Sequence, residues 1–151
     1  MGARRLWYLL GDQDRGKMDC PGTVKAVRRL SERWRGTVTK LIEDKANGSA
    51  VIQLLEGEIP GMIAVTPQGG KVARAMAISS LVEAGNVFLP HPQYATWVEA
   101  FIEECAKFPN GSHDDQVDAM TQALTWLYRQ ATVIRRRVVL NPGGSYMISP
   151  L

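Results

Sequence analysis

The segment His113-Asp114-Asp115-Gln116-Val117-Asp118 places three carboxylates within five residues, at the start of a stretch with helical spacing of apolar residues. Asp114 and Asp118 are four residues apart, and Asp115 and Asp118 are three apart. Residues at these spacings lie on or near one face of a helix. The carboxylates are therefore placed to act together on one ligand.

Two explanations fit this acidic segment. In the first, acids in the opening turn interact with the helix dipole, typically by about 0.3–1 kcal/mol, and Asp115 completes a cap with Ser112. That leaves Asp118 unexplained, because it lies past the favoured turn and repels Asp114 by roughly 0.2–0.5 kcal/mol. In the second, a cation offsets the repulsion. Hard divalent ions prefer carboxylate oxygen, and Mg²⁺ fills its other positions with water and substrate phosphates, so a phosphodiester is the natural substrate.

A second acidic feature, Glu43-Asp44, stands at the end of a predicted strand, before the turn signal Asn47-Gly48. Adjacent strand residues point to opposite faces, so only one of the two acids can aim into a given site. A polar strand end entering a turn explains the pair without any function. However, sites of open α/β sheets lie beyond the carboxyl ends of strands, which favours a functional acid here.

The elements that must position these acids follow from hydrophobic periodicity, turn signals and helix-capping patterns. We expect a strand over 5–10, a polar turn over 11–16 and a short return strand through Lys17-Met18, as a hairpin. After it we expect helices and strands in alternation. They are a helix over 21–36, a strand over 38–44, a helix over 48–56, a strand over 62–65, a helix over 71–84 stopped by Gly85, a strand over 87–89, a helix capped by Thr96 with Glu99, and a long helix capped by Ser112.

This order predicts an α/β fold with a mixed sheet flanked by helices, because parallel neighbours need crossover helices. The chain has 151 residues, 45% hydrophobic and 22% charged, with a net charge of +3, as in an ordinary globular domain with one core. It has no run of about 18 apolar residues, which argues against a membrane span. Cys20 and Cys105 lie 85 residues apart without a CxxC pattern, which argues against a disulfide scaffold or a zinc site. We expect a cytoplasmic protein.

Short motifs follow one another along most of the chain. They are Ile42-Glu43-Asp44-Lys45-Ala46-Asn47-Gly48, Lys71-Val72-Ala73-Arg74-Ala75, Gly85-Asn86-Val87-Phe88-Leu89-Pro90, Trp97-Val98-Glu99, Phe108-Pro109-Asn110-Gly111 and His113-Asp114-Asp115-Gln116-Val117-Asp118-Ala119. Their order, over roughly residues 5–130, resembles the C-terminal nuclease domain of large terminase subunits from tailed bacteriophages and prophages. The resemblance implies an RNase H-like fold and Mg²⁺- or Mn²⁺-dependent cleavage of concatemeric double-stranded DNA, in the bacterial host cell. It also implies genome packaging beside a small terminase subunit and a portal protein.

By position, the resemblance puts the family's strand-end acid on Asp44, with Glu43 as the competing choice. The HDD-type motif falls on Asp114 and Asp115, and Asp118 completes DDxxD. All five are candidate metal ligands; Asp44, Asp115 and Asp118 form the expected catalytic set, with Asp44 and Asp115 as first choices. Two-metal hydrolysis holds the ions about 3.5–4 Å apart, so we expect Asp44 and the second acidic group to converge.

Three basic residues are candidate contacts for DNA phosphates, with solvated surface as the alternative. They are Lys45, beside the acidic strand end, and Lys71 and Arg74, which are three residues apart on one predicted helix. We divide the chain into a nuclease domain over 1–130 and a basic C-terminal tail over 131–151, which holds Arg135-Arg136-Arg137.

The sequence departs from the family at two points. It has no GxxxxGK[ST] pattern for ATP hydrolysis, so we expect at most the nuclease part. The family's first strand, with a metal-binding Asp, would lie ahead of residue 5, and Asp12 and Asp14 read as turn residues. We therefore expect an N-terminally truncated domain that cleaves DNA poorly by itself. The alternatives are a catalytically inactive prophage remnant that acts only in DNA binding or motor docking, and another RNase H-like nuclease such as a junction resolvase.

Overall fold

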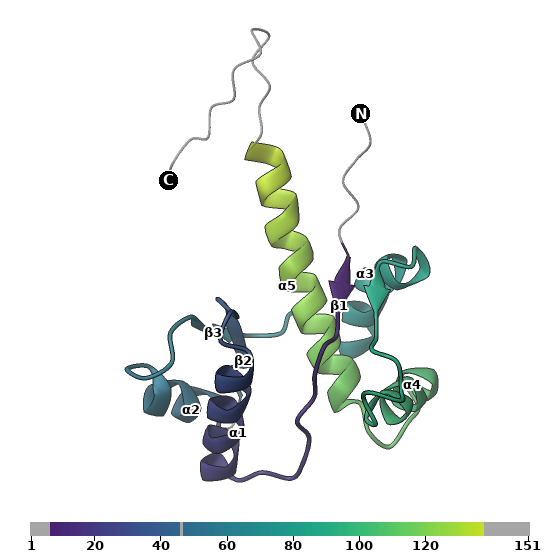
Figure 1. The fold of residues 1–151 in the computed structure, drawn as a ribbon. Helices are drawn as coiled ribbons and strands as arrows, with labels where there is room; N and C mark the ends of the chain where they lie inside the picture. The colour runs from purple at the N-terminus through teal and green to yellow at the C-terminus, as the bar shows by residue number, and fades with distance from the viewer. Residues whose placement is uncertain (1–6, 46, 138–151) are drawn as a thin grey trace, which may run out of the picture. The chain divides into compact units, whose positions relative to one another are not determined.

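The computed structural model describes residues 7–45 and 47–137, with side chains up to residue 131. They form two compact units (Figure 1). One, the β2 unit, consists of Gly11–Gln68. The other, the α5 unit, combines the strand before Gly11 with the chain from Gly69 onward. One domain over 1–130, and a further strand ahead of residue 5, stay predictions.

The β2 unit runs α1 (Cys20–Arg33), β2 (Lys40–Glu43), α2 (Gly48–Leu55) and β3 (Met62–Val65). Strands β2 and β3 pair in parallel, from Lys40 opposite Met62 to Glu43 opposite Val65, and α2 makes the crossover. The crossover helix packs on α1 through a core of buried apolar side chains, which are Val24, Val51, Leu55 and Ile59. The carboxyl ends of both strands therefore lie at one edge of the sheet.

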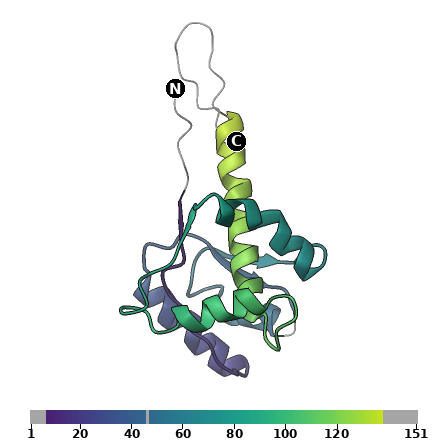
Figure 2. The same cartoon turned by 90° about the vertical axis from the view of Figure 1, so that its right-hand side faces the viewer.

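The α5 unit runs β1 (Tyr8–Leu9), α3 (Lys71–Glu83), β4 (Val87–Phe88), α4 (Val98–Lys107) and α5 (Asp115–Arg137). Strand β1 pairs in parallel with β4, with Tyr8 opposite Val87. The buried cluster of Tyr8, Ile78 and Leu124 joins β1, α3 and α5. The first turns of α5 lie against α4 and its middle lies against α3 (Figure 2). This packing decides which side chains meet the acids at the start of α5.

The expected α/β class is confirmed, but the sheets differ from the expectation. The part of the chain that the structure describes holds two separate two-stranded parallel sheets, β1–β4 and β2–β3, in place of a single mixed sheet. The hairpin through Lys17-Met18 is wrong, because β1 pairs with β4 and residues 17–18 form no strand. The polar turn is fastened to α1 instead, where Asp12 bonds Arg33 and Asp14 bonds Arg29. Both acids therefore act as turn residues.

Most helices and strands lie where the sequence predicts them, whereas two expected caps do not form. Helix α4 begins at Val98 after Trp97, without a side-chain cap from Thr96, and α5 begins at Asp115, three residues beyond Ser112. Helix α5 continues to Arg137, so the expected tail is helical up to that residue, and residues 138–151 lie outside the described part. Within the described residues, no helix is both long enough and apolar enough to cross a membrane.

Candidate metal site

The start of α5 has an unusual cap. Asp114 directly precedes the helix, and its carbonyl oxygen accepts the amide of Asp118 at 2.9 Å, which makes it the N-cap residue. An N-cap Asp normally accepts the amides two or three residues further on. Here Glu104 Oε1 accepts both, from Gln116 N at 2.7 Å and from Val117 N at 3.3 Å. The Asp114 carboxylate is therefore not needed as the cap of its own helix.

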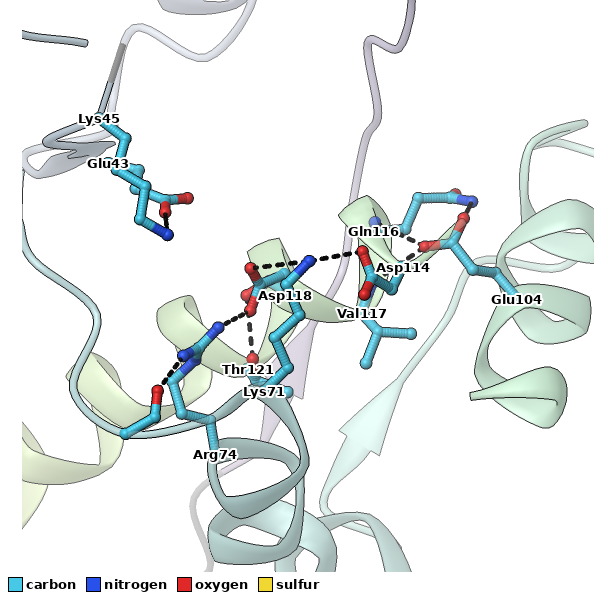
Figure 3. A network of polar contacts seen from close by, with 11 residues as sticks. Glu43, Lys45, Lys71, Arg74, Glu104, Asp114, Gln116, Val117, Asp118 and Thr121 are labelled. Carbon is cyan, nitrogen blue, oxygen red and sulfur yellow. Dashed lines mark hydrogen bonds and ion pairs between the residues drawn. The ribbon is translucent and has the colours of Figure 1, made fainter. Parts of the chain in front are cut away.

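Glu104 belongs to α4 and is buried, with 6% of its surface exposed. Its second oxygen, Oε2, accepts a hydrogen bond from the side-chain amide of Gln116, which is also buried (Figure 3). Two backbone amides and a side-chain amide thus satisfy this buried carboxylate, as burial of a charged group requires. The contact ties the first turn of α5 to α4.

The carboxylate of Asp114 turns to a cation on α3. Lys71 Nζ lies 2.7 Å from Asp114 Oδ1 and 4.0 Å from Asp118 Oδ2 (Figure 3). The hydrogen bond to Asp114 is the main cause that raises the pKa of Lys71 above its usual value, and the charges of Asp118 and Asp115 add to it. Lys71 is therefore charged at neutral pH, and its ammonium group offsets the charge of Asp114.

Asp118 is held more tightly, by Arg74 one turn along α3. Arg74 Nη2 donates to Asp118 Oδ1, and only 12% of each side chain is exposed. Arg74 Nη1 also donates to the carbonyl oxygen of Gly69 at 2.7 Å, just before α3. Asp118 therefore fastens α3 to α5 through Arg74, whereas Asp115, between the two paired acids, is exposed.

The acids of the β2 unit lie at the carboxyl edge of its sheet. The amide of Asp44 donates to Val65 O at 2.9 Å, and the Asp44 carboxylate accepts a hydrogen bond from the Ser49 hydroxyl. Lys45 Nζ lies 2.7 Å from Glu43 Oε1. The chain reverses tightly into α2, where a Cβ on Gly48 would lie 1.9 Å from the Glu43 carbonyl oxygen. The expected strand-end position of Glu43 and Asp44 is thus confirmed.

The structure brings together four of the predicted site residues, Asp114, Asp118, Lys71 and Arg74, and exposes Asp115 beside them. The convergence of Asp44 with this group stays a prediction, as does DNA contact by Lys45, Lys71 and Arg74. Sequence reasoning missed Glu104 and Gln116. The sequence does carry a signal for Glu104, because this acid interrupts the apolar stripe of Phe101, Cys105 and Phe108 on its predicted helix.

A comparison of the sequence with known protein families bears on the class of this fold. The model of the terminase RNaseH-like domain matches residues 3–126. The chain belongs to this family. No curated protein and no solved structure gives a significant match. By class, this terminase domain is therefore RNase H-like and of the nuclease type.

The donor chemistry of the α5 start fits a hard divalent cation. Asp114 and Asp115 are neighbours in the sequence and both carry carboxylate oxygens. Mg²⁺ is commonly bound through one or two protein carboxylates, with water and phosphate oxygens as the remaining ligands. In residues 7–45 and 47–131, no group of three or more His, Cys, Asp or Glu side chains is arranged to hold an ion. Ion binding at Asp114 therefore has to replace Lys71 as the partner of this carboxylate.

Proposed function

We propose that this terminase domain is a divalent-metal-dependent endonuclease that cleaves concatemeric double-stranded DNA during phage genome packaging. The observation that carries the proposal is that the Asp114 carboxylate is turned away from the helix amides it precedes and toward a half-exposed cation, Lys71. A carboxylate used only as a helix cap would bind those amides itself. This arrangement argues against a capping role for Asp114, whereas Asp118, expected beyond the first turn, lies within it because α5 begins at Asp115.

In this proposal Asp114 and Asp115 hold Mg²⁺ or Mn²⁺, and Asp44 is a further ligand with Glu43 as its competitor. When bound, the metal supplies activation of a water nucleophile and stabilisation of the leaving oxygen. Lys71 and Lys45 bind the DNA backbone. Asp118 orients the acidic helix start by its ion pair with Arg74 on α3.

The cellular setting of the proposal comes from the resemblance. The domain would act in the cytoplasm of a bacterial host, with double-stranded DNA as substrate and with a small terminase subunit and a portal protein as partners. A genome-packaging nuclease acts on linear concatemers, whereas a junction resolvase requires branched DNA. Cleavage of branched duplex with linear duplex left intact would therefore contradict this proposal in favour of a resolvase.

The direct test is cleavage of plasmid DNA by the chain with Mg²⁺ or Mn²⁺. We expect slow metal-dependent nicking that Asp115→Asn reduces to the metal-free level, because this exposed carboxylate is a first-choice ligand. The matched control is Glu103→Gln, which neutralises an exposed acid on α4 that pairs with Lys107. Equal cleavage by the wild type and Asp115→Asn would remove Asp115 from the proposed site.

A second candidate is a domain that binds DNA or docks on the packaging motor without cleaving. The ion pairs Lys71–Asp114 and Arg74–Asp118 favour it, because a purely structural role for both acids would produce the same contacts. Two results together would support this candidate: the wild type and Asp115→Asn bind duplex DNA equally well, and neither cleaves it when metal is present.

A further inference from the structure

A buried carboxylate lies between two helices of the α5 unit, next to the acids of the candidate metal site. Glu104 shares its face of α4 with the buried Val98 and Phe101. An ionisable group in such surroundings is retained only where hydrogen bonds replace its lost hydration. Three hydrogen bonds to Glu104 come from the first turn of α5. The burial of Glu104 is therefore coupled to the conformation of that turn.

The amides bound by Glu104 are those that an N-cap side chain takes. Counted from the N-cap Asp114, Gln116 and Val117 occupy the second and third helical positions. Asp is among the strongest N-cap residues, so an uncapped α5 would draw the Asp114 carboxylate back onto these amides. Such a rotation would remove it from Lys71, which it contacts at 2.7 Å.

We propose that Glu104 is a positioning residue, which caps α5 in place of Asp114 and thereby keeps the Asp114 carboxylate available to a metal ion. The proposal rests on the proposed function, in which Asp114 is a metal ligand. Gln116 assists, because its side-chain amide fixes the second oxygen of Glu104. Groups that orient metal ligands in this way typically change metal affinity by about 10–100-fold when they are removed.

The first test measures Mn²⁺ affinity of the full chain by titration calorimetry. Glu104→Leu fills the buried site but offers no acceptor, and we expect Mn²⁺ to bind about 10-fold more weakly, at the low end of such effects. Glu104→Gln keeps one acceptor oxygen for the helix amides and should recover most of the affinity. Glu103→Gln, on the exposed side of the same helix, should leave it unchanged. Unchanged affinity in Glu104→Leu would overturn the proposal.

The second test needs no metal. Asp114→Ala should lower the Tm only slightly in the wild type, because only the ion pair with the half-exposed Lys71 is lost. In Glu104→Leu, where Asp114 becomes the cap, the same substitution should lower the Tm further. A purely structural Glu104 would instead give additive shifts, which would overturn the proposal. Glu104→Met, which has a similar volume and no carboxyl oxygen to accept from the helix amides, replaces Glu104→Leu in this cycle if the latter does not fold.

The two tests separate the further inference from the proposed function. Failure of the wild type to bind Mn²⁺, with non-additive Tm shifts, would contradict the metal site but support capping by Glu104. Binding of Mn²⁺ by the wild type that Asp115→Asn abolishes and Glu104→Leu leaves unchanged would support the metal site and overturn the role of Glu104.

Discussion

The three acids at the start of α5 differ in what holds them, although the sequence presents them as one cluster. Asp118 is fastened to Arg74 with little exposure, Asp114 pairs with the more exposed Lys71, and Asp115 is exposed. In the proposed metal site, a cation arriving from solvent would therefore meet Asp115 first and would compete with Lys71 for Asp114. Asp118 would have to break a largely buried ion pair to bind it.

Metal binding should stabilise the folded chain, because a ligand that binds only the folded state adds to its stability. At a free metal concentration of about 100 times Kd the gain is about 2.7 kcal/mol. For a chain of this size that corresponds to a Tm rise of roughly 5–11 °C. We expect Asp115→Asn to reduce the rise, measured by thermal unfolding with and without Mn²⁺. The same rise in the wild type and in Asp115→Asn would exclude this residue as an important ligand.

The sequence alone could not predict which basic side chains pair with these acids. The spacing of the acids predicted a shared face, but nothing local to residues 113–118 indicates which cations lie opposite. Lys71 and Arg74 are more than 40 residues away along the chain and reach the acids only because α3 packs against α5. The role of Glu104 likewise depends on how α4 meets α5.

At the scale of elements, patterns within a few residues predicted those features that depend only on neighbouring residues, such as the positions of helices and strands. Strand β3 and the start of α3 lie where the sequence puts them, and Gly85 has the positive φ of 67° expected just past a helix. The hairpin after β1 was wrong because the partner of β1 is β4, almost 80 residues further on. Two caps were wrong because Ser112 and Thr96 lie too far before their helices.

The turn before α1 should contribute to stability in a way that depends on pH. Hydrogen bonds from the Trp34 indole, and next from Arg33, lower the pKa of Asp12 despite its burial. A lowered pKa means stability that is present above the unfolded-state pKa, about 3.9, and lost as the pH falls through the folded-state value. We expect Asp12→Asn to cost roughly 1 kcal/mol at pH 7, the usual size for one hydrogen-bonded group, and less below about pH 4.

Thermal unfolding of both proteins between pH 2.5 and 7 measures this gap. In the Trp34→Phe background, which removes the main donor to Asp12, the gap should be smaller at every pH. A gap that is independent of pH would mean that the charge of Asp12 does not stabilise the turn.

The junction of β2 and α2, which places Glu43 and Asp44, gives a prediction on packing. Gly48→Ala would bring a Cβ within 1.9 Å of the Glu43 carbonyl oxygen, so the backbone must move. We expect a loss of about 1–3 kcal/mol in the free energy of unfolding, as for other overpacked sites. Gly57→Ala is the matched control, because nothing lies within 4 Å of its added Cβ. Equal stability of the two variants in urea would contradict the close approach.

At the scale of the whole molecule, a net charge of +3 gives only a mild attraction to DNA. Phosphate contacts must then come from particular cations, and each contact contributes about 0.9 to the slope of log affinity against log salt. Lys45 and Lys71 are exposed enough to make such contacts, whereas Arg74 is largely buried against Asp118. Arg74 is therefore the weakest of the three predicted contacts.

The Lys71–Asp114 pair should link DNA binding to metal binding. A phosphate that takes Lys71 releases Asp114 for a cation, and a cation at Asp114 releases Lys71 for a phosphate, so each ligand should raise the affinity for the other. Lys71→Ala should then bind Mn²⁺ more tightly without DNA, because a competitor for Asp114 is gone, yet bind duplex DNA more weakly, with a salt slope reduced by about 0.9. Lys107→Ala removes an exposed lysine from an ion pair on α4 and serves as the matched control. Calorimetry measures the Mn²⁺ affinity, and DNA titrations at several salt concentrations measure the DNA affinity and its salt slope. If Lys71→Ala behaves as Lys107→Ala does in both experiments, the Lys71–Asp114 ion pair does not link the two ligands.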